Sequence, residues 1–288
     1  MNKFRTMSGY TKTACLVLPA FILTAGITVY TIVSTCIESM GYLPGLNLYG
    51  FSLDNFRILF SDRTFPESLA YSFTIAACST IMCLVFGLVL GYLVCKVNNP
   101  LIQTLYRMPF ILSYIAAGIL IYTTLSDHGV LWHILSLIGI APKGFNIVYN
   151  SSGIAVITLN CFKGVPFMAM STAPAFFRAT KHFPATAMNL GASGFLTARK
   201  IILPLVKHSA LTTALVLFNY QLFSYEGFYY LGSSTPVSLG VLAYESNLFS
   251  DLRSRTLCMT ISTVMIGISL ISSAAYIYVM RKDWINLK

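Results

Sequence analysis

Six long apolar runs separate the polar parts of this chain of 288 residues and restrict the folds that it can adopt. Each run is long enough to cross the hydrocarbon core of a bilayer as a helix, which takes about 20 residues. The runs lie at residues 13–37, 68–94, 108–125, 153–177, 205–225 and 256–280. We therefore expect an all-α polytopic membrane protein with one transmembrane domain over residues 13–280.

The composition agrees with a membrane protein and excludes a soluble two-domain enzyme. Hydrophobic residues make up 56% of the chain and charged residues 10%, whereas a soluble domain is about one quarter charged. The first run is longer than a signal-peptide core of about 7–15 residues, and no small-x-small cleavage site follows it, which indicates an uncleaved anchor. The seven cysteines include no Cys-x-x-Cys pair, so neither a disulfide framework nor a metal site is predicted.

The placement of charge predicts how the chain is threaded. With six spans, one side of the membrane holds residues 1–12, the loops at 95–107 and 178–204, and the tail at 281–288. When the second of these loops is extended to residue 208, that side carries thirteen Lys and Arg residues and one acidic residue. The other side carries five Lys and Arg residues and eight acidic residues. Because cytoplasmic loops are enriched in Lys and Arg, both termini are expected in the cytoplasm. This asymmetry accounts for the net charge of +10 without a nucleic-acid partner.

The runs and loops carry further local signals. Small residues in the second run, among them Gly87 and Gly91, favour close helix packing in lipid. Gly164, Pro166 and Pro174 are expected to break the fourth run. The segment GVLWHILSLIGI between spans three and four is too short to cross a bilayer and predicts an interfacial or re-entrant helix. Residues 226–255 are expected to form a mixed loop.

The segment from Pro184 to Pro204 predicts a docking element outside the lipid. It reads PATAMNLGASGFLTARKIILP, and it carries two basic residues and no acid. Its small residues suit a short helix that packs closely against a partner. Gly191 is suited to end that helix, because glycine adopts the left-handed conformation at little cost.

Gly191, Ile201, Leu203 and Pro204 stand at a spacing that resembles the EAA loop of permeases of binding-protein-dependent ABC importers. Ala185, Thr186 and Ala187 occupy the positions of the Glu-Ala-Ala group, so the family's glutamate is missing. The segments around 129–140 and 229–245 also resemble this family, especially its polyamine, iron, sulfate and phosphonate subgroup.

The resemblance implies a type I permease fold with six transmembrane helices and a cytoplasmic coupling helix in the 184–204 part of the loop. It implies separate ABC ATPase subunits, a second permease subunit that is identical or a sister chain, an extracytoplasmic substrate-binding protein, and the lipid of a bacterial inner membrane. The chain would itself be no enzyme and would need no cofactor, because ATP hydrolysis would occur on the partner.

Two ionisable residues are candidates for the translocation path. Lys163 lies at mid-depth of the fourth run, on the same predicted face as Asn160 and close to Pro166. A charge at that depth is costly and usually faces a cavity or a partner. Glu226 follows Asn219 at the outer end of the fifth run. Lys163 could contact an anionic substrate, pair with Glu226 as a gate, or be paired structurally, and Glu226 could be a solvated interfacial carboxylate.

Other function classes find less support in the sequence. The chain contains no phosphate-binding G-x-x-x-x-G-K-[ST] loop and no catalytic motif, so no catalytic residue is predicted. A secondary active transporter would instead show an inverted repeat and a coupling-ion site at mid-depth. An intramembrane enzyme or sensor lacks motif support.

Overall fold

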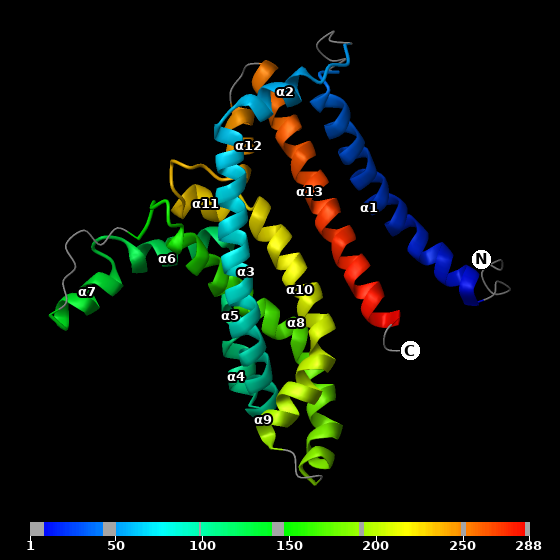
Figure 1. Cartoon of the computed structure of the whole chain (residues 1–288), viewed down its shortest axis with the longest axis vertical. Helices are drawn as coiled ribbons and strands as arrows, with labels where there is room; N and C mark the ends of the chain where they lie inside the picture. Colours follow the sequence, from blue (N-terminus) through cyan, green and yellow to red (C-terminus); the bar gives the residue numbers. More distant parts are fainter. Residues whose placement is uncertain are drawn as a thin grey trace. The chain divides into compact units, whose positions relative to one another are not determined.

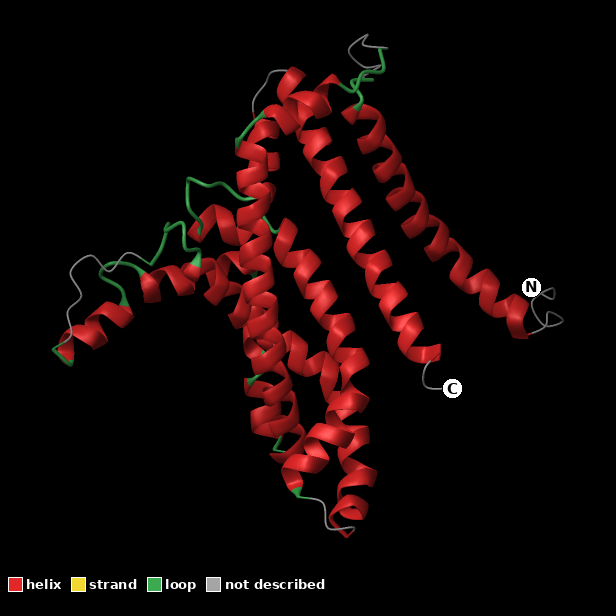
Figure 2. Ribbon diagram, in the orientation of Figure 1, coloured by secondary structure: helices red, strands yellow, loops and turns green. Residues whose placement is uncertain are grey.

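The structure is a computed structural model that describes residues 9–42, 50–97, 99–139, 147–189, 193–248 and 252–285. All regular secondary structure in these ranges is helical (Figure 2). The helices, labelled as in Figure 1, are α1 Gly9–Ser39, α2 Asp54–Ser61, α3 Thr64–Val97, α4 Pro100–Leu105, α5 Met108–Ile111, α6 Tyr114–Leu125, α7 Val130–Leu137, α8 Ile154–Asn189, α9 Gly194–Thr197, the π-helical turn η3 Ala198–Ile202, α10 Leu203–Phe223, α11 Glu226–Leu231, α12 Leu239–Leu248 and α13 Leu252–Ile285.

Five helical segments are long and apolar enough to cross a membrane: Val17–Ser39, Thr64–Val97, Ile154–Thr180, Ala198–Phe223 and Ser254–Tyr278. A pair bent by 97°, Pro100–Ile111 and Tyr114–Leu137, would be the sixth if it forms one span. The predicted runs therefore correspond to five long helices and one broken pair, and α3 and α13 extend beyond the predicted runs at both ends.

The third predicted span is divided between α5 and α6. Leu112 has an extended backbone with ψ of 141°, which ends α5. Ser113 then starts α6 as its N-cap, and its Oγ accepts a hydrogen bond from the Ala116 amide at 3.1 Å. A serine that satisfies a free amide at the start of a helix favours a new helix at that point. A continuous helix over 108–125 was therefore not the correct expectation.

By contacts within the chain, residues 1–61 and 246–267 form one compact unit, and residues 62–245 and 268–288 form another. In the first unit, Arg255 of α13 forms an ion pair of 3.2 Å with Glu38 of α1. Thr260 and Thr263 of α13 donate hydrogen bonds to the carbonyls of Ser39 and Thr35. These polar contacts hold the C-terminal end of α1 against α13.

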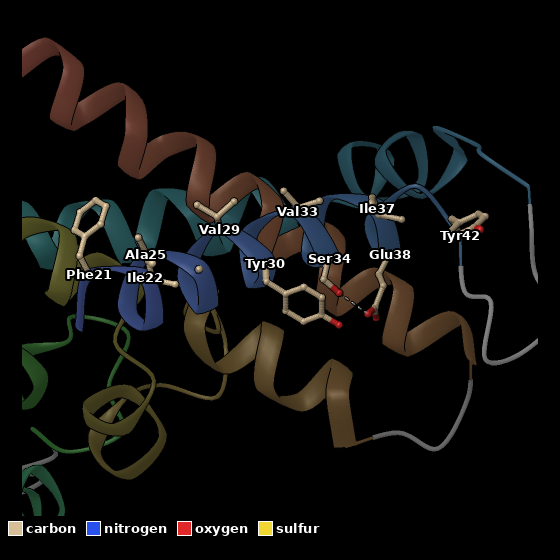
Figure 3. Close-up of a pocket in the computed structure, with 11 residues that line it drawn as sticks. Phe21, Ile22, Ala25, Val29, Tyr30, Val33, Ser34, Ile37, Glu38 and Tyr42 are labelled. Atoms are coloured by element: carbon tan, nitrogen blue, oxygen red, sulfur yellow. Dashed lines mark hydrogen bonds between the residues drawn. The ribbon is translucent and has the colours of Figure 1, made fainter. Parts of the chain in front are cut away.

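From Val17 onward, α1 presents apolar side chains that are mostly exposed. Phe21 and Tyr30 are 67% and 74% exposed. Figure 3 shows the hollow along this face, from Phe21 to Tyr42, where Ser34 donates a hydrogen bond of 3.2 Å to Glu38. Apolar side chains exposed along a span are expected for a helix that faces lipid or another chain.

In the second unit, α3, α8 and α10 pack along one another (Figure 1). Glycines bring the backbones of α3 and α8 close together, as the small residues of the second run predicted. A Cβ placed on Gly87 would lie 2.5 Å from the Cβ of Met168, and one on Gly164 would lie 2.5 Å from the Sγ of Cys83. Small residues at such contacts let transmembrane helices pack by dispersion.

Helix α8 continues through the positions that were expected to break it. It runs without interruption from Ile154 to Asn189, across Gly164, Pro166 and Pro174. Pro166 is buried among neighbouring helices, and such surroundings allow proline inside a transmembrane helix. The fourth span is therefore one continuous helix and not two, although each proline lacks an N–H and leaves one backbone carbonyl without its helical hydrogen bond.

The predicted mixed loop at 226–255 contains two short helices, α11 and α12, which contribute residues to a hydrophobic core of this unit. Phe228 and Leu231 of α11 are buried against Tyr71 of α3 and Leu159 of α8. The helix predicted in the 129–140 segment is α7, which forms the end of the second member of the bent pair. Short helices that carry apolar residues thus follow the third and the fifth predicted spans.

Candidate translocation site and coupling loop

Lys163 lies on α8 beside the break between α5 and α6. Its Nζ donates a hydrogen bond to the Leu112 carbonyl, whose backbone ends α5. The same Nζ lies 4.7 Å from the centre of the Tyr114 ring, in cation–π geometry. Both contacts are with uncharged groups, and no ion pair of Lys163 occurs among the described residues. The half-buried ammonium therefore has no direct ion-pair partner within the described part of the chain.

A cavity of about 330 Å³ opens beside this lysine between α5, α6, α8 and α10. Aromatic rings form much of its wall. Phe110 stacks on Phe167 with ring centres 5.7 Å apart, and the centres of Tyr114 and Tyr220 are 5.5 Å apart. Lys163 supplies the charge in this lining. Cavities of this size with aromatic walls and few polar groups are typical of small-molecule sites.

A second cavity, of about 680 Å³, lies further along the same face of α8, towards its C-terminal end. Arg107 and Arg178 line it, together with Met170 and Pro174 of α8. Lys163, Phe167, Met170, Pro174 and Arg178 follow one another at spacings of three and four residues, which places them on one helical face. One stripe of α8 therefore borders both cavities.

Asn160 faces α3 and not the cavity of Lys163. It is 1% exposed, and its Nδ2 donates a long hydrogen bond of 3.4 Å to Ser79 of α3. Close by, Thr80 donates to Gln221 of α10 at 3.0 Å. Asn160 Oδ1 has no partner within the described part of the protein. These amides and hydroxyls join α3, α8 and α10 inside the helix bundle, where unpaired polar groups are costly.

The other predicted path residues also take separate positions. Pro166 is buried in α8. Asn219 accepts a hydrogen bond of 2.9 Å from Ser272 of α13, and its own amide donates to the Leu215 carbonyl. Glu226 is half-buried at the start of α11, and the described residues show no ion pair between it and Lys163. Within the described residues, Lys163 thus forms no hydrogen bond or ion pair with Asn160, Asn219 or Glu226.

The predicted coupling residues lie at the turn between α8 and α10. Ala185, Thr186 and Ala187 belong to the last turns of α8, which extends to Asn189, and Gly191 lies outside the described residues. Ile201 is in η3, and Leu203 and Pro204 begin α10. The apolar spans cover Ile154–Thr180 and Ala198–Phe223, so residues 181–197 extend past both. The expected short helix at 184–193 is therefore continuous with α8 up to Asn189.

Sequence reasoning missed Arg107, Tyr114, Tyr220 and Gln221. Arg107 was counted as a cytoplasmic charge, and the structure places it in the wall of the second cavity. The tyrosines are inside apolar runs, where an aromatic residue gives no distinct signal. Gln221 could have been predicted to lie inside the bundle, because a glutamine within an apolar run needs a buried hydrogen-bond partner.

The chain is similar in sequence to permease proteins of several ABC transport systems, although no protein-family model matches it. It is 25% identical over 191 residues to the probable sulfate transport system permease protein cysT of Chlorokybus atmophyticus, covering 64% of this chain and 63% of that protein. It is 30% identical over 158 residues to the spermidine/putrescine transport system permease protein PotB of Escherichia coli strain K12, covering 54% and 56%. The match spans just under two thirds of the length of the first of these relatives.

Solved structures agree with the sequence relatives. A bacterial ABC transporter involved in the import of the acidic polysaccharide alginate has a chain with a TM-score of 0.73 and 16% identity, covering 96% of this chain and 99% of that one. The alginate transporter in complex with an alginate-bound periplasmic protein gives a TM-score of 0.76 with 17% identity and 94% coverage of both chains. The chain is thus a homologue of the permease proteins of binding-protein-dependent ABC importers, and it has the type I permease fold.

Proposed function

We propose that this chain is the membrane-spanning permease subunit of an ATP-driven ABC importer. The observation that carries the proposal is the combination of sequence and fold: permease proteins of ABC systems are its relatives, and an ABC importer chain matches nearly its whole length in structure. The chain forms a translocation path through the bacterial inner membrane. ATP is hydrolysed by a separate ATPase subunit.

The segment between α8 and α10 couples this path to the ATPase. Residues 181–197 lie between the apolar spans Ile154–Thr180 and Ala198–Phe223 and belong to neither. Arg199 and Lys200 follow in η3, directly before α10, and both are exposed. A continuous α8 supports coupling, because one helix connects its last turn, which includes Ala187, to the cavity beside Lys163. Movement imposed at the last turn then reaches the path through this helix.

The path itself follows the stripe of α8 from Lys163 to Arg178. Two open cavities along one helical face support this course, as does the broken third span, because irregular backbone within a membrane is stable only beside protein or a water-filled cavity. A second permease subunit covers the open side, and an extracytoplasmic binding protein delivers the substrate. With both termini in the cytoplasm, the 178–204 loop also lies on the ATPase side.

The names of the relatives do not agree on one substrate. Their names include sulfate, molybdate/tungstate and spermidine/putrescine, which are anions in the first two cases and cations in the last. A secondary active transporter is the alternative function. It would couple uptake to an ion gradient, and a midplane ion site would be expected. Among the described residues, no group of three or more His, Cys, Asp or Glu side chains could hold a metal ion.

Affinity capture of the tagged chain from its native membrane, in mild detergent, tests the proposal. We expect an ATP-hydrolysing subunit and a permease subunit to be captured with it, and the captured complex to hydrolyse ATP. A chain that is captured alone, without ATPase activity, and that takes up solute in proteoliposomes under an ion gradient without ATP would contradict the proposal and favour the secondary transporter.

A further inference from the structure

The cavity beside Lys163 holds a positive charge that has no ion-pair partner among the described residues, and this charge restricts which substrates can enter. The Nζ donates one hydrogen bond, to the Leu112 carbonyl, and has the Tyr114 ring beside it. An ammonium has three donors. Neither contact neutralises the charge, and no acidic side chain is among the residues that line this cavity. A charge within a membrane is costly unless it is paired, so an incoming anion would gain the stabilisation that this lysine lacks.

The second cavity repeats the same sign of charge. Arg107 and Arg178 line it, and none of its described lining residues is acidic. The Nε of Arg107 is hydrogen-bonded to the Tyr106 hydroxyl at 3.3 Å, and its guanidinium lies over the ring of that tyrosine. These contacts are again with uncharged groups. A solute that leaves Lys163 along the stripe of α8 therefore meets two more cations.

Glu226 is the acid that acts against this pattern. It is near enough to interact electrostatically with Lys163, but it is absent from the linings of both cavities. It begins α11 and no ion pair joins it to Lys163 in the described structure. Its charge therefore lowers the attraction of the cavity for an anion, while Lys163 keeps no direct ion pair in the described structure. The gate formed by a Lys163–Glu226 pair, one of the alternatives from the sequence, is not the arrangement observed.

We propose that the substrate is a small organic anion whose carboxylate or phosphoryl group contacts Lys163 and whose body packs against the aromatic wall. Phe110, Phe167 and Tyr220 supply that wall, and the volume of about 330 Å³ admits a small molecule. Arg107 and Arg178 receive the anion next, on its way along α8. The inference rests on the proposed permease role and adds the charge of the substrate to it.

Binding of three ligands of similar shape tests the charge directly. Benzylphosphonate, benzyl alcohol and benzylamine are an anion, a neutral molecule and a cation on the same ring. Ligand-observed NMR would be used with the full chain in nanodiscs of phosphatidylcholine, with empty nanodiscs as the blank. We expect benzylphosphonate to bind about 10- to 100-fold more tightly than benzyl alcohol, as for a hydrogen bond to a charged group, and benzylamine to bind most weakly.

Variants assign the effect to its residues. Lys163→Met is expected to lose at least about fivefold of the preference for the phosphonate, and adding Arg107→Gln and Arg178→Gln is expected to bring anion and alcohol to parity. Lys163→Arg keeps the charge and should keep most of the preference, which separates loss of charge from loss of fold. Lys96→Met, at an exposed position near the end of α3, removes the same charge elsewhere and should bind like the wild type.

Equal binding of the three ligands, tighter binding of benzylamine, or an equal loss in Lys96→Met and Lys163→Met would overturn the proposal. Glu226→Gln should strengthen phosphonate binding in the wild type. Persistence of this effect in the Lys163→Met background shows that Glu226 repels the anion directly, and its loss there shows that Glu226 acts through Lys163. The measurement needs no ATPase. A failure here would reject the anionic substrate and leave the permease role to its own test.

Discussion

Replacing Gly87 with alanine adds one methyl group where α3 and α8 are closest. The new Cβ would lie 2.5 Å from both Cβ and Cγ of Met168 and 3.1 Å from the Val165 carbonyl oxygen. Carbon atoms in favourable contact are about 3.5–4.0 Å apart, so the side chain or the helices must move by about 1 Å. Overpacking of this kind typically costs about 1–3 kcal/mol. We expect the unfolding equilibrium to shift about 5- to 150-fold towards the unfolded state.

Gly267→Ala is the matched control for this substitution. Gly267 is also in the middle of an apolar helix, and a Cβ placed there would have no heavy atom within 4 Å. Alanine favours a helix over glycine by up to about 1 kcal/mol, so this variant should be unchanged or more stable. Reversible unfolding in mixed detergent micelles, followed by circular dichroism, measures both. If Gly87→Ala is as stable as Gly267→Ala, the close approach of α3 and α8 is wrong.

Three further predictions follow from the polar contacts and the loops. Thr80→Val removes the donor to Gln221 and should cost about 1 kcal/mol of unfolding free energy, whereas Thr74→Val, at an exposed position of the same helix, should cost little. Gly191→Val should reduce transport while expression and membrane insertion persist, because a β-branched residue resists a left-handed turn, and full transport would count against a coupling role there. Single cysteines near Asp54, Lys143 and Asp251 should react from the extracytoplasmic side, and labelling of any of them only from the cytoplasm would refute the six-span topology.

The long helices could be predicted from the sequence because lipid requires long apolar segments, whatever they pack against. Tertiary contacts were needed for the rest. The break at Leu112 depends on Ser113 as a helix cap, which is a single hydroxyl within an apolar run. The prolines of α8 were expected to break it, but their effect depends on the packing around Pro166. Local sequence carries little of this information.

The candidate site was predictable only in part, for the same reason. Lys163 is conspicuous because it is a charge inside an apolar run, and the structure brings it to a cavity. Helical spacing grouped it with Asn160, but three residues correspond to about 300° of rotation, and this difference is enough to aim Asn160 at α3. Arg107 lines the second cavity together with Gln103 and Tyr106, just before the bend between α5 and α6. The local sequence signal for that bend is the single helix-capping residue Ser113.

Contact between the end of α8 and an ATPase subunit tests the coupling role most directly. A single cysteine at Ala187, in the complex captured from membranes, would be cross-linked to cysteines introduced on the surface of the ATPase. Ile271→Cys, on an exposed face of the last long helix, serves as the control. We predict cross-links from position 187 that change with ATP binding, and none from position 271. Absence of cross-links at 187 in an ATP-hydrolysing complex would contradict coupling through this loop.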